Sequence, residues 1–249
     1  MCELLGFSAR EATDINKQLR EFFAHCDSNP HGWGLLYSGT CEREGIRADK
    51  SLRLERILDN IQPQRALIGH IRFATVGKVT TDNCHPFSAK DITGRSWTLA
   101  HNGTVYQAGK LVHTYSQRKG DTDSEAMFLY LLERINQASE NGGLSSSQRF
   151  ELVDRFVCEL SYRNKLNLMI YDGELLYIHK NMEDTMKYRR LESGVIFATK
   201  PLDRQTWHDV PTAQLTAYKD GELVYTGEKH GGVFRSNLEY VTVTDAMNI

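Results

Sequence analysis

Hydrophobic and polar positions follow two kinds of pattern along the chain, and together they predict both strands and helices. Short apolar runs bounded by turn residues predict strands. Apolar residues spaced three and four positions apart predict helices with one buried face. The predicted strands are residues 2–8, 35–37, 66–73, 97–101, 166–171, 175–179, 194–199, 215–218 and 223–225, and the predicted helices are residues 12–25, 51–61, 123–135 and 146–160.

Three dipeptides that favour tight turns separate some of these strands. Asp172-Gly173 and Asp220-Gly221 each stand between two strand patterns and predict hairpins. Asn102-Gly103 is expected to end the strand before it. The order of elements differs from the regular alternation of a parallel α/β sheet, and two antiparallel sheets with helices outside fit it better. With no linker or internal repeat in view, we expect a single domain over residues 1–249.

Composition narrows the class of protein. The 249 residues carry a formal net charge of −2, so neither a nucleic-acid surface nor a membrane-surface patch is expected. We expect neither a secretory signal nor a membrane-spanning helix. The five cysteines are odd in number and none are spaced as C-x-x-C, which argues against a disulfide framework. A cytoplasmic protein is therefore expected.

Cys2 stands directly behind the initiator methionine. Removal of Met1 would leave a thiol and a free α-amine on one residue. An α-amine with an ordinary pKa near 8 is partly neutral at neutral pH and can take the proton of its own thiol. Such a thiol would attack an amide or ester carbonyl. Taken alone, Cys2 is more simply an arbitrary second residue.

Three other motifs have both a chemical and a structural interpretation. Arg72 ends an apolar strand and could hold a carboxylate, or form an internal salt bridge. Asn102-Gly103 could aim two N–H donors at an oxyanion, or form a plain turn. Asp123, next to a Thr122–Glu125 pattern typical of a capping box, could accept a substrate ammonium or simply favour a helix start.

Cys84 and His85 are adjacent, and neighbours on an extended strand point to opposite faces. We interpret them as a loop or pocket wall rather than a catalytic pair. The nine histidines show no spacing typical of a metal site. In combination, a nucleophile, a carboxylate anchor and an ammonium anchor describe a γ-glutamyl amide, of which glutamine is the simplest.

Four separated blocks now show a resemblance to the class II glutamine amidotransferases, a branch of the N-terminal nucleophile hydrolases. The blocks are Cys2, the run Gly69-His70-Ile71-Arg72-Phe73-Ala74-Thr75-Val76-Gly77, His101-Asn102-Gly103, and Thr122-Asp123-Ser124-Glu125. They occur in the order found in that family. Phe73 stands where many members have Trp or Tyr, and Val76 stands where some have His.

The resemblance implies a four-layer α/β/β/α sandwich and a γ-glutamyl thioester formed on Cys2. It implies that Asn102 and Gly103 form the oxyanion hole, that Arg72 binds the substrate α-carboxylate and that Asp123 binds its α-amine. Phe73, Thr75 and His85 are expected to line the substrate site. No cofactor and no metal are expected, and a separate ammonia-accepting enzyme is the partner that the family's stand-alone members suggest.

Three alternatives remain open from the sequence. The substrate could be a γ-glutamyl peptide rather than glutamine. The chain could hydrolyse another amide through its N-terminal cysteine, without needing Arg72 and Asp123 for an amino-acid head. It could also be a non-enzymatic subunit that keeps the fold, in particular if Met1 is retained.

Overall fold

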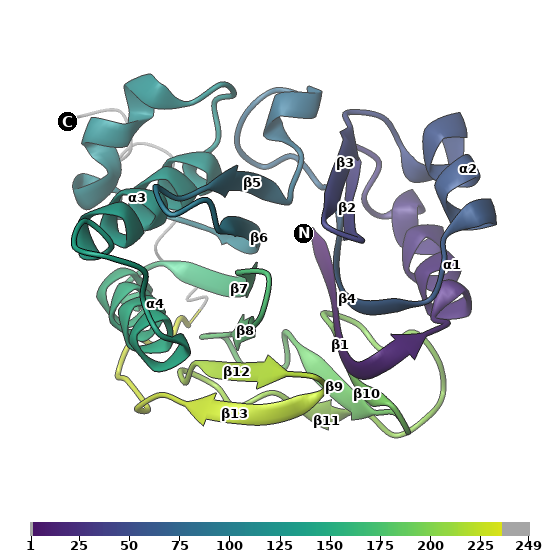
Figure 1. The fold of residues 1–249 in the computed structure, drawn as a ribbon. Coiled ribbons are helices and arrows are strands. Elements are labelled where there is room, and N and C mark those ends of the chain that lie inside the picture. Colours follow the sequence, from purple (N-terminus) through teal and green to yellow (C-terminus); the bar gives the residue numbers. More distant parts are fainter. Residues whose placement is uncertain (1, 236–249) are drawn as a thin grey trace.

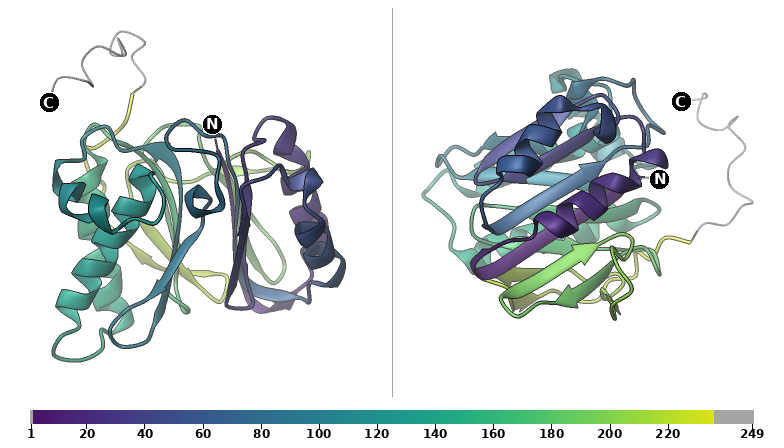
Figure 2. Two further views of the ribbon diagram at one scale, coloured as in Figure 1. Left: turned by 90° about the horizontal axis from the view of Figure 1, so that it is seen from above. Right: turned by 90° about the vertical axis from the view of Figure 1, so that its right-hand side faces the viewer.

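The computed structural model describes residues 2–235 and shows two β-sheets packed face to face between two layers of helices. Figure 1 shows one sheet on each side of the central space, with helices covering the outer faces. The view from above in Figure 2 shows the same four layers edge on. This is the predicted α/β/β/α sandwich, because each sheet buries one face against the other and one face against helices.

The first sheet has seven strands in the order β11-β9-β10-β1-β4-β2-β3. Its strands are β1 (Glu3–Thr13), β2 (Trp33–Tyr37), β3 (Thr40–Glu44), β4 (Gln64–Ile71), β9 (Lys187–Arg190), β10 (Gly194–Ala198) and β11 (His208–Asp209). All of its pairings are antiparallel. The central pair, β1 and β4, reaches the start of the chain with Glu3 opposite Ile71.

The second sheet has six strands in the order β13-β12-β8-β7-β6-β5. Its strands are β5 (Phe87–Lys90), β6 (Ser96–Thr104), β7 (Lys165–Tyr171), β8 (Leu176–His179), β12 (Thr216–Lys219) and β13 (Glu222–Thr226). These pairings are antiparallel too. The first sheet is thus built from β1–β4 and β9–β11 and the second from β5–β8 and β12–β13, so neither sheet forms from one continuous segment.

The helices divide between the two outer faces (Figure 1). They are α1 (Asn16–Ala24), α2 (Leu52–Asn60), α3 (Asp123–Ala138) and α4 (Ser146–Ser161), with short 3₁₀ turns η1 (His25–Asp27), η2 (Ala48–Lys50), η3 (Thr81–Asn83) and η4 (Gly109–Gln117). The first two cover the seven-stranded sheet and the second two cover the six-stranded sheet. Ser51 and Ser145 cap α2 and α4 with their side chains.

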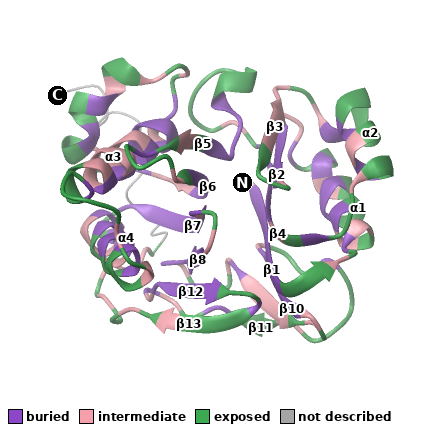
Figure 3. Cartoon of the chain, viewed as in Figure 1, coloured by how far each residue is buried: buried purple, intermediate pink, exposed green. Residues whose placement is uncertain are grey.

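Buried apolar residues form three clusters, and Figure 3 shows that most residues of the central strands β1, β4, β6 and β7 are buried. Leu5 and Phe7 of β1 face α1 and α2. Leu4 of β1, Ile68 of β4 and Ala100 of β6 lie between the two sheets. Since strand residues alternate between faces, this assignment fixes which neighbouring side chains point into the central space.

Several predicted boundaries are wrong. The strand predicted at residues 66–73 is Gln64–Ile71, so Arg72 lies just beyond its end. The strand at the start of the chain continues to Thr13, so the first helix begins at Asn16 rather than at residue 12. Asn102-Gly103 does not form a turn, because β6 continues through both residues to Thr104. There, Gly103 pairs with Leu166 of β7. Tertiary pairing to β7 outweighs the local turn preference of this dipeptide.

The predicted Asp-Gly hairpins are confirmed. Asp220 and Gly221 both have positive φ and form the two-residue connection of β12 and β13, which is the conformation that a type I′ turn requires. Asp172-Gly173 lies between β7 and β8. Within the described residues, we find no helix that has the length and apolar character needed to span a membrane.

Candidate active site

Strand alternation directs the predicted nucleophile and one predicted anchor into the space between the sheets. Cys2 lies two residues before Leu4, and Arg72 lies four residues after Ile68, so both share the face of the inter-sheet core. Asn102 lies two residues after Ala100 and points into the same space from the opposite sheet. Figure 1 shows the start of β1 beside the space between the two sheets.

The backbone of Phe73 fixes the thiol of Cys2. The Phe73 N–H donates to Sγ of Cys2 across 3.3 Å, and Sγ lies 3.4 Å from the Phe73 carbonyl oxygen. Part of the residue reaches solvent, but protein atoms surround the thiol, and this burial raises its pKa. The Phe73 N–H and the Arg72 charge act in the opposite direction. The site thus supplies some, but not all, of the stabilisation that a thiolate needs.

Arg72 is buried, and its guanidinium holds the loop that follows it. Nη1 donates to the carbonyl oxygen of Lys78 at 2.9 Å, and Nη2 donates to that of Val76 at 2.9 Å. Over residues 2–235 no carboxylate pairs with Arg72, so the alternative of an internal salt bridge is not found there. A buried cation without a counter-ion is well suited to an anionic ligand group.

Asn102 is buried, and no hydrogen bond of its side-chain amide appears among the described residues. Next to it, Gly103 lies very close to β7. A β-carbon on Gly103 would lie 1.8 Å from the Lys165 carbonyl oxygen and 2.4 Å from Nε2 of His101. Only glycine fits this position, and the close approach fixes the Asn102-Gly103 backbone relative to β7.

Asp123 is the first residue of α3, on the helix side of β6. Its Oδ2 accepts from the Val105 N–H at 2.6 Å, and its Oδ1 accepts from the Ser124 N–H at 2.9 Å. No described hydrogen bond or ion pair joins Asp123 to Cys2 or Arg72. Asp123 is half-buried. A substrate ammonium would have to reach its carboxylate at the end of β6, where the oxygens already accept from Val105 and Ser124.

The predicted capping box at α3 is wrong in one half. Thr122 caps the helix by accepting from the Glu125 N–H. The Glu125 carboxylate, however, accepts from the N–H groups of Lys119 and Gly120, both at 2.8 Å, and so holds the preceding loop.

Two loops close the outer end of the site, and Asp121 joins them. Its Oδ1 accepts from the Lys78 N–H at 3.1 Å and from the side-chain amide of Asn83. Phe73 and Thr75 lie exposed on the first of these loops. The Phe73 ring packs against His31, whose Nδ1 accepts from the Ala74 N–H at 2.9 Å.

His85 belongs to a buried histidine cluster that the sequence analysis did not identify. His85 Nδ1 lies 3.1 Å from His70 Nε2 and 3.4 Å from the His101 N–H that donates to it. Burial lowers the pKa of His70 to about 3 and that of His85 well below its usual value, so both rings are neutral. The cluster connects β4 to β6 across the central space. No group of three potential ligands suited to a metal ion occurs within residues 2–235.

Lys165 is the other residue that sequence reasoning missed. It begins β7 and is almost completely buried, and this burial lowers its pKa, while a thiolate at Cys2 would act in the opposite direction. The residues around Lys165 in the sequence do not indicate that it is buried. Its position beside Asn102 results from the register between β6 and β7, which is a tertiary feature.

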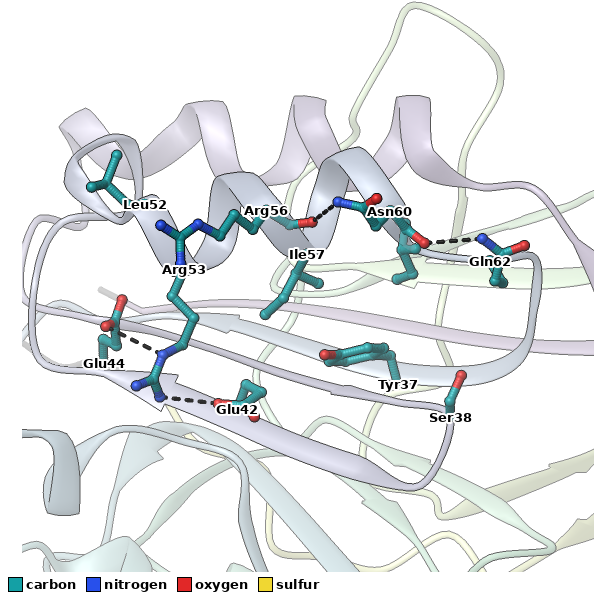
Figure 4. Close-up of a pocket in the computed structure, with 11 residues that line it drawn as sticks. Tyr37, Ser38, Glu42, Glu44, Leu52, Arg53, Arg56, Ile57, Asn60 and Gln62 are labelled. Atoms are coloured by element: carbon teal, nitrogen blue, oxygen red, sulfur yellow. Dashed lines mark hydrogen bonds and ion pairs between the residues drawn. The ribbon is translucent and has the colours of Figure 1, made fainter.

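A separate groove lies on the outside of the seven-stranded sheet (Figure 4). It has a volume of about 780 Å³ and lies between α2 and the β2–β3 hairpin. None of the predicted site residues lines it. Its walls include Tyr37, Ile57 and an Arg53 that pairs with Glu42 and Glu44. The groove is therefore not part of the site around Cys2.

Two antiparallel sheets between helical layers form the sandwich that N-terminal nucleophile hydrolases share, and Cys2 directly precedes its central strand β1. Residues 1–192 match the family model of the class-II glutamine amidotransferases, and the chain belongs to that family. Membership supports action on the glutamine amide, by hydrolysis or transfer.

Two relatives are similar to this chain over 90% or more of its length. YafJ of Escherichia coli, named only provisionally as a glutamine amidotransferase, is 26% identical over 90% of this chain and 100% of its own. An uncharacterized protein of Methanocaldococcus jannaschii is 26% identical over 92% of this chain and 72% of its own.

Solved structures share the fold. A predicted glutamine amidotransferase from Pseudomonas aeruginosa has a TM-score of 0.63 at 24% identity and covers 90% of this chain and 100% of its own. The glutamine phosphoribosylpyrophosphate amidotransferase of B. subtilis has a TM-score of 0.68 at 14% identity. It is matched over 94% of this chain but only 50% of its own.

Proposed function

We propose that this chain hydrolyses the side-chain amide of glutamine or of a γ-glutamyl compound, with Cys2 as the nucleophile after removal of Met1. Met1 itself lies outside the described residues. The observation that carries the proposal is the position of the Cys2 thiol, held by the Phe73 N–H and adjacent to an Arg72 that has no carboxylate partner in the described chain. A nucleophile next to an unpaired buried cation suits a substrate with a carboxylate of its own.

The chemistry divides into two steps. The α-amine of Cys2 takes the thiol proton, the thiolate adds to the amide carbonyl, and the amine then gives a proton to the departing ammonia or amine. Water next attacks the γ-glutamyl thioester and releases glutamate. The Asn102 side chain and the Gly103 N–H would stabilise the oxyanion of both tetrahedral intermediates.

The remaining predicted residues would bind the substrate. Arg72 would hold the α-carboxylate and Asp123 the α-ammonium. Phe73 and Thr75 on the exposed loop would form the outer wall, and His85 would support the inner wall from the histidine cluster. A separate enzyme that accepts the ammonia remains part of the proposal.

The test is glutamate release from glutamine and from γ-glutamyl peptides by protein shown by intact mass to lack Met1. We expect release by the wild type and none by Cys2→Ala. Cys158→Ala, which changes a half-buried cysteine on α4, is the matched control and should retain full activity. Absence of release from every such substrate, with an unblocked Cys2, would refute the proposal.

A further inference from the structure

Lys165 is a buried cation that the proposed mechanism leaves unused. Along β7 the side chains of Leu166, Leu168 and Ile170 pack toward α3 and α4. Met169, on the other face, belongs to the core between the sheets. Alternation therefore directs Lys165 into the central space, and the residue is only 5% exposed.

The register of β6 and β7 places this lysine beside the proposed oxyanion hole. Asn102 pairs with Asn167 and Thr104 with Lys165, so Asn102 and Lys165 are diagonal neighbours on one face. The backbone of Lys165 is fixed as well, because its carbonyl oxygen lies 2.9 Å from Nε2 of His101. The start of the Lys165 side chain is therefore held at the edge of the proposed oxyanion hole.

The titratable side chains around the thiol come from three segments. Arg72 directly follows β4, Lys165 begins β7, and Cys84, in the loop before β5, is neutral because burial raises the pKa of its thiol to about 11. The neighbouring rings of His70 and His85 are neutral because burial lowers the pKa of each. Burial also lowers the pKa of Lys165, and the attraction of the Cys2 thiolate opposes that shift. The pKa of the Cys2 thiol is raised, mainly because the thiol is buried.

We propose that the ammonium group of Lys165 stabilises the thiolate of Cys2 in the protein that has lost Met1. The thiol proton passes to the α-amine of Cys2, while Lys165 keeps its own proton and changes no bond. Its charge offsets the loss of hydration that the thiolate suffers between the sheets. The inference deepens the proposed function and rests on it for turnover, but the thiol chemistry can be measured without any substrate.

The first experiment follows alkylation of Cys2 by iodoacetamide as a function of pH, read by peptide mass spectrometry on Met1-free protein. In Lys165→Met, we expect the pH midpoint of Cys2 alkylation to rise by about one unit relative to the wild type, because a charge that attracts the thiolate is lost. Lys165→Arg should restore the midpoint toward the wild-type value, because it keeps the charge. An unchanged midpoint in folded Lys165→Met would overturn the proposal.

Lys180→Met is the matched control. Lys180 is also buried, its pKa is also lowered by burial, and it pairs with Asp209 at 3.6 Å rather than with Cys2. Its loss should leave the midpoint unchanged. An equal rise in both variants would assign the effect to general loss of buried charge and would also overturn the proposal.

A second measurement needs no lysine variant. The reciprocal effect predicts that the pKa of Lys165, followed by NMR of ¹³C-lysine protein, falls when Cys2 is replaced by Ala. Equal Lys165 pKa values in the wild type and in Cys2→Ala would overturn the proposal. If the thiol midpoint shifts but no γ-glutamyl substrate is hydrolysed, only the proposed function fails and the Lys165–Cys2 interaction stands.

Discussion

Gly103 lies so close to Lys165 that a β-carbon on the glycine would stand 1.8 Å from the lysine carbonyl oxygen. This contact joins β6, which carries the proposed oxyanion hole, to β7, which carries the buried lysine. Any side chain at residue 103 must separate the two strands at the point where the site is built. The geometry of the site therefore depends on the absence of a single methyl group.

Gly103→Ala should destabilise the protein by about 1–3 kcal/mol, because the added carbon cannot be accommodated without moving backbone. Glutamine hydrolysis should fall at least tenfold, because a misplaced donor stabilises the oxyanion poorly. Thermal melting and initial rates measure the two effects. The control is Gly109→Ala, where no atom lies within 4 Å of the added carbon. Equal melting temperatures for Gly103→Ala and the wild type would contradict the described β6–β7 contact.

Arg72→Lys should raise KM for glutamine about tenfold or more, because lysine cannot reproduce the charge-assisted, bidentate hold on a carboxylate. Steady-state kinetics with glutamine measure the change. Arg43→Lys is the control, since Arg43 also donates to a loop carbonyl, that of Cys84, at 2.8 Å. A similar rise in both variants would mean that Arg72 acts only by holding its loop. No change in KM for Arg72→Lys would favour an amide substrate without an amino-acid head.

Asp121→Ala should separate the loop at residues 73–80 from the start of α3, because Asp121 accepts from both Lys78 and Asn83. We expect KM to rise severalfold while kcat changes less, since Asp121 holds the loop at Lys78 and Asn83, away from the Phe73 N–H that donates to the thiol. Limited proteolysis should also cut the loop faster. Asp82→Ala is the control, because the side chain of Asp82 makes no hydrogen bond among the described residues. Equal kinetics for the two variants would show that the tie has no effect on binding.

Glu3 follows the proposed nucleophile Cys2 in the chain, and its carboxylate forms two ion pairs. The stability that these ion pairs contribute depends on pH. Burial alone would raise the pKa of Glu3, but hydrogen bonds from His25 and Lys200 outweigh it and hold the pKa below the usual 4.5. Oε2 of Glu3 lies 2.7 Å from Nδ1 of His25, and Oε1 lies 2.5 Å from Nζ of Lys200. A lowered pKa means that the stabilisation is complete above about pH 4.5 and is lost as pH falls through the folded-state value.

Glu3→Gln should therefore cost about 1–3 kcal/mol at pH 7, and the difference from the wild type should shrink below about pH 4. Urea unfolding at several pH values measures both. Asp59→Asn, which breaks an exposed pair with Arg20, should cost no more than about 0.5 kcal/mol. A Glu3→Gln deficit that does not change with pH would assign the effect to packing rather than charge.

Local patterns in the sequence were sufficient for the parts of the fold that depend on near neighbours. The Asp220-Gly221 hairpin, the Thr122 cap and the apolar faces of α3 and α4 each follow from residues within a few positions. The motif order around Cys2, Arg72, Asn102 and Asp123 also sufficed for the family, which the match to residues 1–192 confirms. These features are encoded locally, so they can be read without the tertiary structure.

Tertiary structure alone decided the features that depend on strand register. Asn102-Gly103 prefers a turn locally but lies within β6, because pairing with β7 supplies more hydrogen bonds and burial than a turn would. The same register buries Lys165 beside Asn102, and the packing of the two sheets brings His70 of β4 against His85 from the loop before β5. The β6–β7 pairing, between residues 60 or more positions apart, and the contact of the two histidines carry no local signal, because the interacting groups meet only when both sheets have formed.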